Sequence, residues 1–230
     1  MMVVMSELKK KNREFVIPGD EIIRSMDYIP GKNCFREGES IYAKRLGLVE
    51  ITGRVVSVIP LSGVYIPRVG DMVIGRIEEL QVNGWLVDIN SPCIAYLPFS
   101  GVREYIDPVK VDPLKIYNVG DMIYAKVASM VGKVSVTLSM LDPRARKFKT
   151  GRILKISPVK IPRLIGKRGS MINLLKEKAR CKISVGQNGL VWAEGEKIDV
   201  IVKVIKLIEK ESHVEGLTDM IAELLEKEGS

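Results

Sequence analysis

The sequence predicts an α+β protein, mainly β, built from three modules in a row. Short strand candidates separated by glycines fill residues 1–67, and five longer strand candidates fill residues 68–142. Helical periodicity becomes prominent only in residues 143–230. Hydrophobic residues make up 46% of the chain and charged residues 28%, which is typical of folded globular domains.

The first module, residues 1–67, is predicted to be a set of β-hairpins. After the apolar start Met1–Met5, its first 14 residues are mostly polar, and glycines divide the rest. Ser40–Lys44 and Gly53–Ile59 have the β-branched, alternating character of strands. Because so small a module buries little core of its own, we expect it to dock on a neighbour.

The second module, residues 68–142, is predicted to be a five-stranded Greek-key barrel of the OB type. Gly70-Asp71 and Gly120-Asp121 form turns that open the first and fourth strands. A long connection containing Pro108 follows the third strand. Five strands with one long connection after the third are typical of this barrel. The strand candidates are Met72–Ile77, Trp85–Ile89, Ile94–Phe99, Met122–Ala128 and Lys133–Leu138.

The third module, residues 143–230, mixes strands and helices. Ser170 is predicted to cap a helix that runs to about Ala179. Apolar residues at helical spacing then predict one helix from Ile198 and another from Leu217. The predicted strands are Arg152–Ile156, Lys182–Val185 and Leu190–Glu194, the last two forming a hairpin.

Positive charge is concentrated in this third module. Residues 143–180 hold thirteen Lys or Arg against one acidic residue, whereas the whole chain carries +8. A local concentration of this kind indicates a polyanionic partner. Its first part could be a phosphate-tracking arm or a solvated linker, and we slightly favour the arm; its residues are Arg144, Arg146, Lys147, Lys149 and Arg152.

Gly166-Lys167-Arg168-Gly169 lies in the middle of this basic segment. With its flanking isoleucines it matches the I-G-x-x-G-x-x-I signature of KH domains, and the element order resembles a type I KH domain. The resemblance implies that the loop clamps about four nucleotides while bases lie in an apolar groove. The alternative is a loop that packs on a neighbouring domain. The implied RNA-binding residues are Ile161, Arg163, Ile165, Gly166, Lys167, Arg168, Gly169, Ile172 and Ile183.

The barrel also resembles a known family. Gly70–Ile77, Gly84–Ile89 and Ala95–Ser100 are similar to the ribosomal-protein S1 type of RNA-binding domain, although Pro98 stands where many members carry histidine. Such domains stack bases on exposed aromatic residues beside basic ones. Acidic residues outnumber basic ones in this module, so core packing of the aromatic residues is an even alternative. The implied RNA-binding residues are Trp85, Tyr96, Phe99, Arg103, Lys126 and Lys133.

The sequence argues against catalysis, metals and membranes. Acidic residues near the basic segment are isolated, and His213 is the only histidine, so acid–base or metal-assisted hydrolysis lacks its groups. Cys34, Cys93 and Cys181 are too scattered for a disulfide framework or a zinc site. No apolar run is long enough to cross a bilayer. We therefore expect a cytoplasmic protein without catalytic residues, metal or other cofactors.

The order of the three modules is itself specific. It resembles the S1–KH cap subunit of the RNA exosome, the ribosomal RNA-processing protein 4 family, over about Phe15 to Glu211. The intact glycine loop favours the archaeal form. The resemblance implies a non-catalytic cap subunit that recruits single-stranded RNA and feeds its 3′ end to a phosphorolytic ring.

The implied partners are single-stranded RNA, the ring subunits and other cap subunits in a trimeric cap. The N-terminal module would dock on the ring. Polynucleotide phosphorylase carries the two RNA-binding modules in the opposite order, and proteins of the N-utilisation-substance A type have paired KH units of the other topology. A free-standing S1–KH regulator or RNA chaperone remains the alternative.

Overall fold

The computed structural model describes residues 7–104, 112–132, 134–211 and 220–221. The chain divides into two compact units, Met1–Gly63 and Val64–Ser230. The division falls a few residues before the boundary expected near residue 67, because Tyr65 is buried in the barrel core and its hydroxyl donates to Asp71 at 2.7 Å. In the parts of the chain described, no helix is both long and apolar enough to span a membrane.

The first unit contains two four-stranded sheets with strand orders β1-β3-β6-β5 and β2-β7-β8-β4. Val16, Ile22, Ile41, Val49 and Val56 form much of its core, so the unit has a hydrophobic core of its own. The predicted strands at Ser40–Lys44 and Gly53–Ile59 correspond to β6 and β8. The strands are β1 (Glu7–Leu8), β2 (Phe15–Val16), β3 (Glu21–Arg24), β4 (Ile29–Pro30), β5 (Cys34–Glu37), β6 (Ser40–Ala43), β7 (Gly47–Thr52) and β8 (Val55–Pro60).

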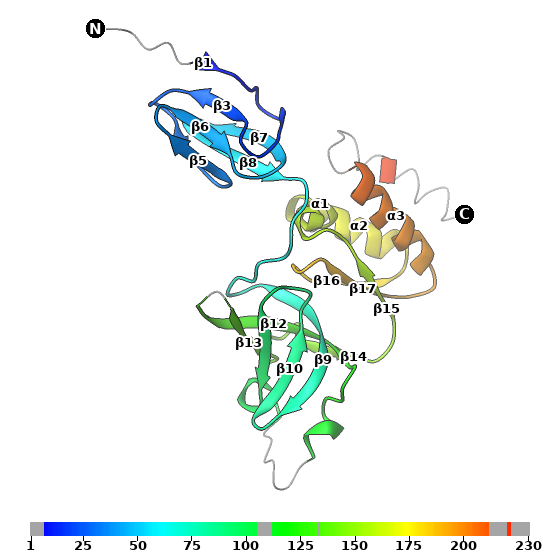
Figure 1. Ribbon diagram of the computed structural model, residues 1–230. Coiled ribbons are helices and arrows are strands. Elements are labelled where there is room, and N and C mark those ends of the chain that lie inside the picture. The colour runs from blue at the N-terminus through cyan, green and yellow to red at the C-terminus, as the bar shows by residue number, and fades with distance from the viewer. Residues whose placement is uncertain (1–6, 105–111, 133, 212–219, 222–230) are drawn as a thin grey trace. The chain divides into compact units, whose positions relative to one another are not determined.

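The second unit begins with the predicted barrel (Figure 1). β11 pairs with β13 in parallel, and β13 also pairs with β12, which closes the barrel. This confirms the five-stranded OB fold. Its strands are β9 (Met72–Gln81), β10 (Gly84–Asp88), β11 (Ile94–Pro98), β12 (Met122–Val131) and β13 (Ser135–Ser139), with short 3-10 helices η1 (Phe99–Gly101) and η2 (Pro113–Lys115) in the connection.

A further strand, β14 (Arg146–Phe148), was not predicted. It pairs antiparallel with β12 and extends the barrel sheet. The basic run therefore forms a strand at Arg146–Phe148, where the sequence predicts an arm or a linker. Two of its cations also have acidic partners, since Arg144 pairs with Asp142 at 3.0 Å and Lys147 pairs with Asp121.

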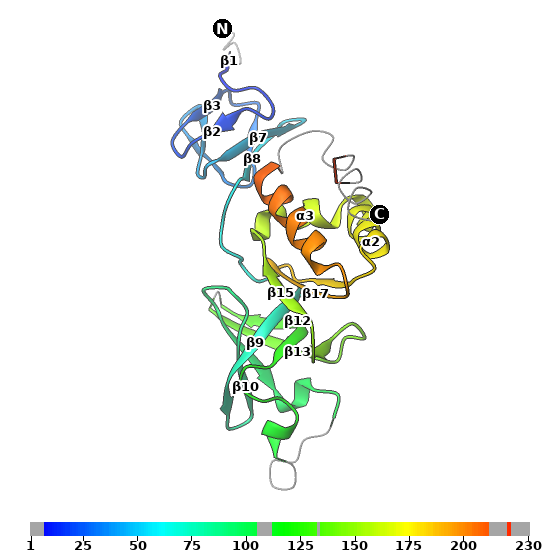
Figure 2. The ribbon, with the colours of Figure 1, turned by 90° about the vertical axis from the view of Figure 1, so that its right-hand side faces the viewer.

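The rest of the second unit has the predicted type I KH order. β15 (Arg152–Lys155), β16 (Lys182–Val185) and β17 (Leu190–Glu194) form an antiparallel sheet with order β15-β17-β16. The helices lie on one face of this sheet (Figure 2). They are α1 (Ile161–Ile165), α2 (Ser170–Lys178) and α3 (Ile198–Glu211), with 3-10 helices η3 (Pro158–Lys160) and η4 (Lys167–Gly169) before α1 and α2.

The start of α2 and the predicted C-terminal helix differ from the sequence prediction in what the structure describes. Ser170 is the first residue of α2 rather than its cap; Gly169 occupies the cap position, and no side-chain hydrogen bond caps this helix end. The helix predicted from Leu217 lies mostly outside the described residues. Of it, Met220 and Ile221 are helical, and Ile221 is buried in the KH core.

Both faces of the KH sheet are covered. On β17, Val191 and Ala193 face the helices, whereas Trp192 joins Ile74 and Phe148 in a cluster shared with the barrel. The rings of Phe148 and Trp192 stack with centroids 4.4 Å apart. Because both faces are buried, β17 reads as a nearly continuous apolar run.

The turn between β16 and β17 fastens the KH domain to the barrel through Asn188. This side chain is fully buried; its Oδ1 accepts from the Ile74 N–H at 3.2 Å, and its Nδ2 donates to the carbonyls of Ile74 at 2.6 Å and Ile89 at 2.8 Å. The Gln187 N–H donates to the Met72 carbonyl at 2.8 Å. The asparagine amide thus supplies hydrogen-bond partners for the backbone of Ile74 in β9 and of Ile89, the residue after β10.

Replacing Asn188→Ala should lower the free energy of unfolding of the second unit by about 3 kcal/mol, because three buried backbone groups lose their partner. Both tryptophans lie in this unit, so urea unfolding followed by tryptophan fluorescence measures it. Gln187→Ala, which keeps the backbone contact, is the control and should change stability by less than about 0.5 kcal/mol. Equal losses of unfolding free energy in the two variants would show that the asparagine amide does not hold the KH domain to the barrel.

Candidate nucleic-acid interface

The glycine loop has a backbone that few residue types adopt. Gly166 has φ +74°, Arg168 φ +51° and Gly169 φ +82°, all in the region that L side chains avoid. A Cβ at Gly166 would lie 2.8 Å from the Cβ of Met171, so a side chain is excluded there by space as well. The two glycines therefore permit the tight turn between α1 and α2.

This backbone presents a positive surface at the start of α2. Lys167 and Arg168 are exposed, and the first turn of α2 contains no acidic residue. N–H groups at a helix N-terminus are oriented outward and carry partial positive charge. Two cations and a helix N-terminus at one place favour a phosphate group.

The isoleucines predicted to form the groove divide into two groups. Ile165 is half-buried beside the loop, whereas Ile172, at 9% exposure, is buried in the KH core. Ile161 is fully buried in the KH core, so the prediction that it lines an RNA groove is wrong. Ile183, at 5% exposure, also packs in that core, whereas Arg163 is exposed.

Trp85 is not an exposed stacking residue; of the two alternatives that the sequence leaves open, the structure agrees with core packing. Its side chain is fully buried, and its Nε1 donates to the Tyr117 carbonyl at 3.0 Å. Its ring meets the rings of Phe99 and Tyr117 edge to face, with centroids 5.0 and 5.2 Å apart. A side chain enclosed in this way belongs to the barrel core and cannot stack on a base.

Alternation along β10 explains this placement. Trp85 and Val87 both point into the barrel, whereas Leu86 points outward beside Tyr96 of β11 and Thr137 of β13. Tyr96 is half-buried and keeps an outward position. Side chains two residues apart on a strand point to the same face. Trp85 and the apolar Val87 therefore share a face, which indicates that Trp85 points to the interior.

The other barrel candidates are not gathered on one surface. Phe99 is half-buried against Trp85. The Arg103 guanidinium donates to the carbonyls of Met140 at 3.2 Å and Asp142 at 2.7 Å. Lys126 pairs with the Asp142 carboxylate at 3.4 Å, and Lys133 lies outside the described residues.

Asp142 is the common partner of these cations. Its hydrogen bonds with Arg144, with a smaller contribution from Lys126, hold the pKa of this carboxyl well below its usual range. Its charge therefore persists at neutral pH and fixes the basic side chains around it.

The described residues supply little for catalysis. They contain no group of three His, Cys, Asp or Glu able to hold a metal. Cys34 and Cys181 are buried, and burial raises the pKa of the Cys34 thiol to about 11. A thiol in this state is a poor nucleophile.

An OB-type barrel joined to a type I KH domain with an intact glycine loop defines a class of proteins with two RNA-binding domains. The comparisons agree with this class. Family models match residues 13–62 (Exosome RNA binding protein RRP4 N-terminal domain), 64–129 (RRP4, S1 domain) and 151–199 (KH domain).

Curated relatives make the assignment specific. Exosome complex component Rrp4 of Thermococcus kodakarensis is 41% identical, covering 96% of this chain and 88% of the relative. That of Methanothermus fervidus is 38% identical, covering 94% and 96%. A crystal structure described as an exosome complex RNA-binding protein is 37% identical with a TM-score of 0.65, covering 72% of this chain and 97% of that one. The chain belongs to the Rrp4 family of exosome complex components.

Trp85→Phe should lower the free energy of unfolding by about 2 kcal/mol, because the buried Tyr117 carbonyl loses its donor. Tyr96→Leu, on the outward face, should change it by less than about 0.5 kcal/mol. Urea unfolding followed by circular dichroism compares the two variants. If Trp85→Phe is as stable as the unmodified chain, the indole hydrogen bond does not hold the barrel as described.

Proposed function

We propose that this chain is a non-catalytic RNA-binding cap subunit of an archaeal exosome. It recruits single-stranded RNA and feeds the 3′ end to the phosphorolytic ring for 3′-to-5′ degradation. The observation that carries the proposal is the exposed Lys167-Arg168 pair, presented by a left-handed glycine loop at the N-terminus of α2. Membership of the Rrp4 family supports it.

The geometry of the loop supports RNA binding there. The ammonium of Lys167 and the guanidinium of Arg168 meet the phosphates, and N–H groups at the start of α2 donate to their oxygens. The accessible surface of the half-buried Ile165 lies next to the loop, and we assign Ile165, with Ile172 packed behind the loop, to the contact with bases. Because most contacts are to the backbone, binding is steeply salt-dependent and only weakly sequence-dependent.

The barrel contributes a second, outward surface around Tyr96. Tyr96 lies between Leu86 and Thr137 in the cross-strand register. A half-buried tyrosine on the outside of an OB barrel can stack on a base while its neighbours enclose the base edge.

In the KH domain, we also assign Gly166, Gly169 and Arg163 to RNA binding.

The first unit offers a face for docking on the ring. Phe15 of β2, Leu48 of β7 and Ile59 of β8 are consecutive cross-strand neighbours. Phe15 is 50% exposed and Ile59 is 43% exposed. A row of exposed apolar side chains on one sheet face is suited to a protein partner, and we assign it to the ring subunits.

The RNA-binding proposal predicts that Lys167→Asp with Arg168→Asp weakens binding of a single-stranded oligonucleotide about 100-fold, since two charge-assisted contacts are lost and repulsion is added. Lys176→Asp with Arg180→Asp changes the net charge equally at the other end of α2 and should cost no more than about fivefold. Fluorescence anisotropy at two salt concentrations measures both. Similar losses of affinity in the two double variants would show that the loop contributes only through its net charge.

The docking proposal predicts that the chain co-purifies with a reconstituted archaeal phosphorolytic ring and that Phe15→Asp with Ile59→Asp abolishes this. Met26→Asp, at another residue that is 68% exposed, is the control. Phosphate-dependent shortening of RNA should require the ring, because the proposed role of this chain is non-catalytic. A chain that binds RNA but never associates with the ring would instead be a free-standing regulator.

A further inference from the structure

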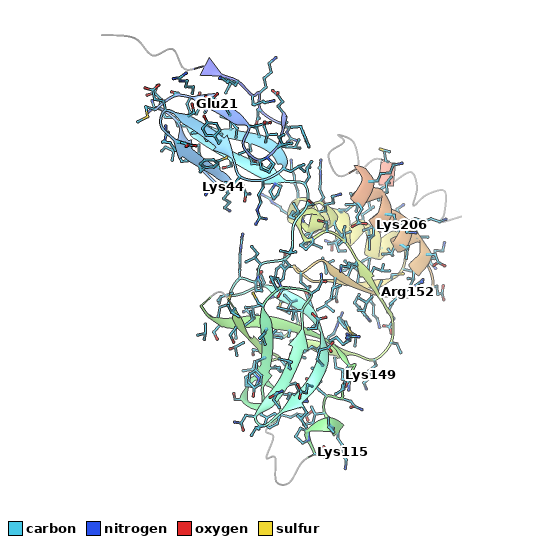
Figure 3. The ribbon with its side chains drawn as sticks, in the orientation of Figure 1. Glu21, Lys44, Lys115, Lys149, Arg152 and Lys206 are labelled. Carbon is cyan, nitrogen blue, oxygen red and sulfur yellow. The ribbon has the colours of Figure 1, made fainter. Side chains whose placement is uncertain are left out.

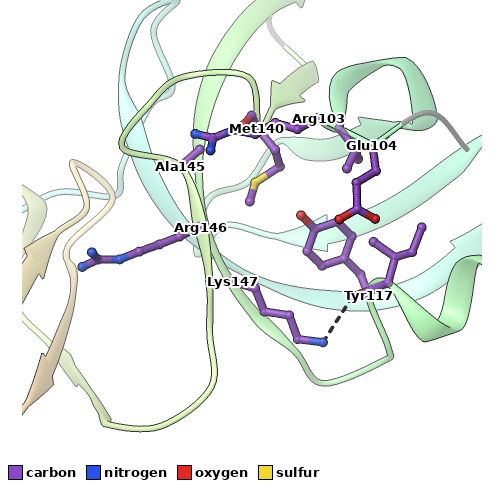
Figure 4. Close-up of a pocket in the computed structure, with 9 residues that line it drawn as sticks. Arg103, Glu104, Tyr117, Met140, Ala145, Arg146 and Lys147 are labelled. Carbon is purple, nitrogen blue, oxygen red and sulfur yellow. Dashed lines mark hydrogen bonds between the residues drawn. The ribbon is translucent and has the colours of Figure 1, made fainter.

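The barrel contains a small open pocket at the side where β14 joins it (Figure 4). Its volume is about 250 Å³. Three segments that are distant in sequence form its walls: the chain after η1, the chain before β12 and the approach to β14. The lining residues are Val102, Arg103, Glu104, Ile116, Tyr117, Met140, Ala145, Arg146 and Lys147.

Buried contacts fix the floor of the pocket. Tyr117 is 7% exposed, its carbonyl accepts from the Trp85 indole, and its ring lies at 89° to the indole ring. Trp85 thereby holds Tyr117 in place from inside the barrel. A floor held by the core is already formed before any ligand arrives.

Two cations at the pocket are also held in place. Arg103 is fixed by the carbonyls of Met140 and Asp142. The Lys147 ammonium pairs with the Asp121 carboxylate, donates to the Ile116 carbonyl at 3.3 Å and lies 5.9 Å from the centroid of the Tyr117 ring. The Arg146 side chain points the other way, toward the KH strands (Figure 4). It donates to the Ser184 hydroxyl at 2.5 Å and lies over Trp192.

The pocket also contains an acceptor. The Glu104 carboxylate lies beside the hydroxyl end of Tyr117 (Figure 4). Burial, followed by the charge of Glu104, raises the pKa of Tyr117, so the phenol stays protonated and can donate. Cations, a carboxylate and a phenol therefore surround one space.

The presence of cations, a carboxylate and a phenol at one pocket indicates which class of ligand it would bind. A simple anion would be repelled by Glu104, and a simple cation by Arg103 and Lys147. A nucleotide satisfies both kinds of group, since its base edge carries N–H donors and its phosphate carries negative charge.

We propose that this pocket is a nucleotide subsite for the single-stranded RNA, with the base edge at Glu104 and Tyr117 and the phosphate at Arg103 and Lys147. The inference rests on the proposed RNA-binding function and adds a contact separate from the glycine loop and from the Tyr96 face. The volume is below the range of about 300–1,000 Å³ that holds drug-sized ligands, which suits one nucleotide.

Exposed lysines flank the pocket along the chain. Lys115, on η2, stands two residues before Tyr117, and Lys149 stands two residues after Lys147. Both are exposed and labelled near the barrel in Figure 3. Neither lysine lines the pocket, so Lys115 offers a charge-matched control for the cations that do.

Two variants and a matched control test the subsite in the full chain with a 20-nucleotide oligo(A) by fluorescence anisotropy. Lys147→Gln removes a pocket cation, and Ala145→Leu fills the space without changing charge. Each should weaken binding about fivefold or more. Lys115→Gln removes the same charge outside the pocket and should cost about twofold or less. Thermal unfolding by circular dichroism identifies any variant that fails to fold.

Ultraviolet cross-linking of the unmodified chain to the same RNA gives a readout that needs no variant. Peptide mass spectrometry should find cross-links at Tyr117 or Met140. No cross-link there, or equal affinities for Lys147→Gln and Lys115→Gln with no loss in a folded Ala145→Leu, overturns the subsite. If Lys167→Asp with Arg168→Asp still abolishes binding, only the subsite is rejected. If the loop variant binds normally as well, the proposed function itself fails.

Discussion

The buried amide of Asn188 is the contact on which the arrangement of the second unit depends. It pairs with the backbone of Ile74 and Ile89 in the barrel while belonging to a KH hairpin. Gly186 is required beside it, because a Cβ there would lie 2.3 Å from the Asn188 Oδ1. The stack of Phe148 on Trp192 adds apolar contact at the same junction. The barrel and the KH domain are thus joined by specific polar and aromatic contacts as well as by the chain.

Binding at the glycine loop depends on a backbone that is costly for ordinary residues. Arg168 adopts φ +51° although it has a side chain, and non-glycine residues in this region are strained by about 1–3 kcal/mol. The neighbouring glycines confine that cost to one residue. In exchange, two cations stand beside the N-terminus of α2, where no acidic residue of the first turn opposes them. This geometry is suited to holding a phosphate backbone.

Local patterns in the sequence were sufficient to predict the modules, the five barrel strands and the KH order. Side-chain placement was harder, because aromatic identity alone does not say which way a strand residue points. For Trp85 the sequence leaves surface and core as even alternatives, although Val87, on the same face of β10, is a core residue. β14 was missed because its strand character comes from pairing with β12, a contact that the run of charges conceals. The role of Asn188 was equally hidden, since its partners lie about a hundred residues away in the chain.

Hydrogen exchange at the glycine loop tests the central claim most directly. The exchange rates of amides 166–172 are compared by mass spectrometry with and without a single-stranded RNA oligonucleotide. If the loop and the start of α2 hold the phosphates, these amides should be protected on binding, with no shortening of the RNA. Exchange that is unchanged at 166–172 while the RNA is bound elsewhere would contradict the assignment of this loop as the principal RNA contact.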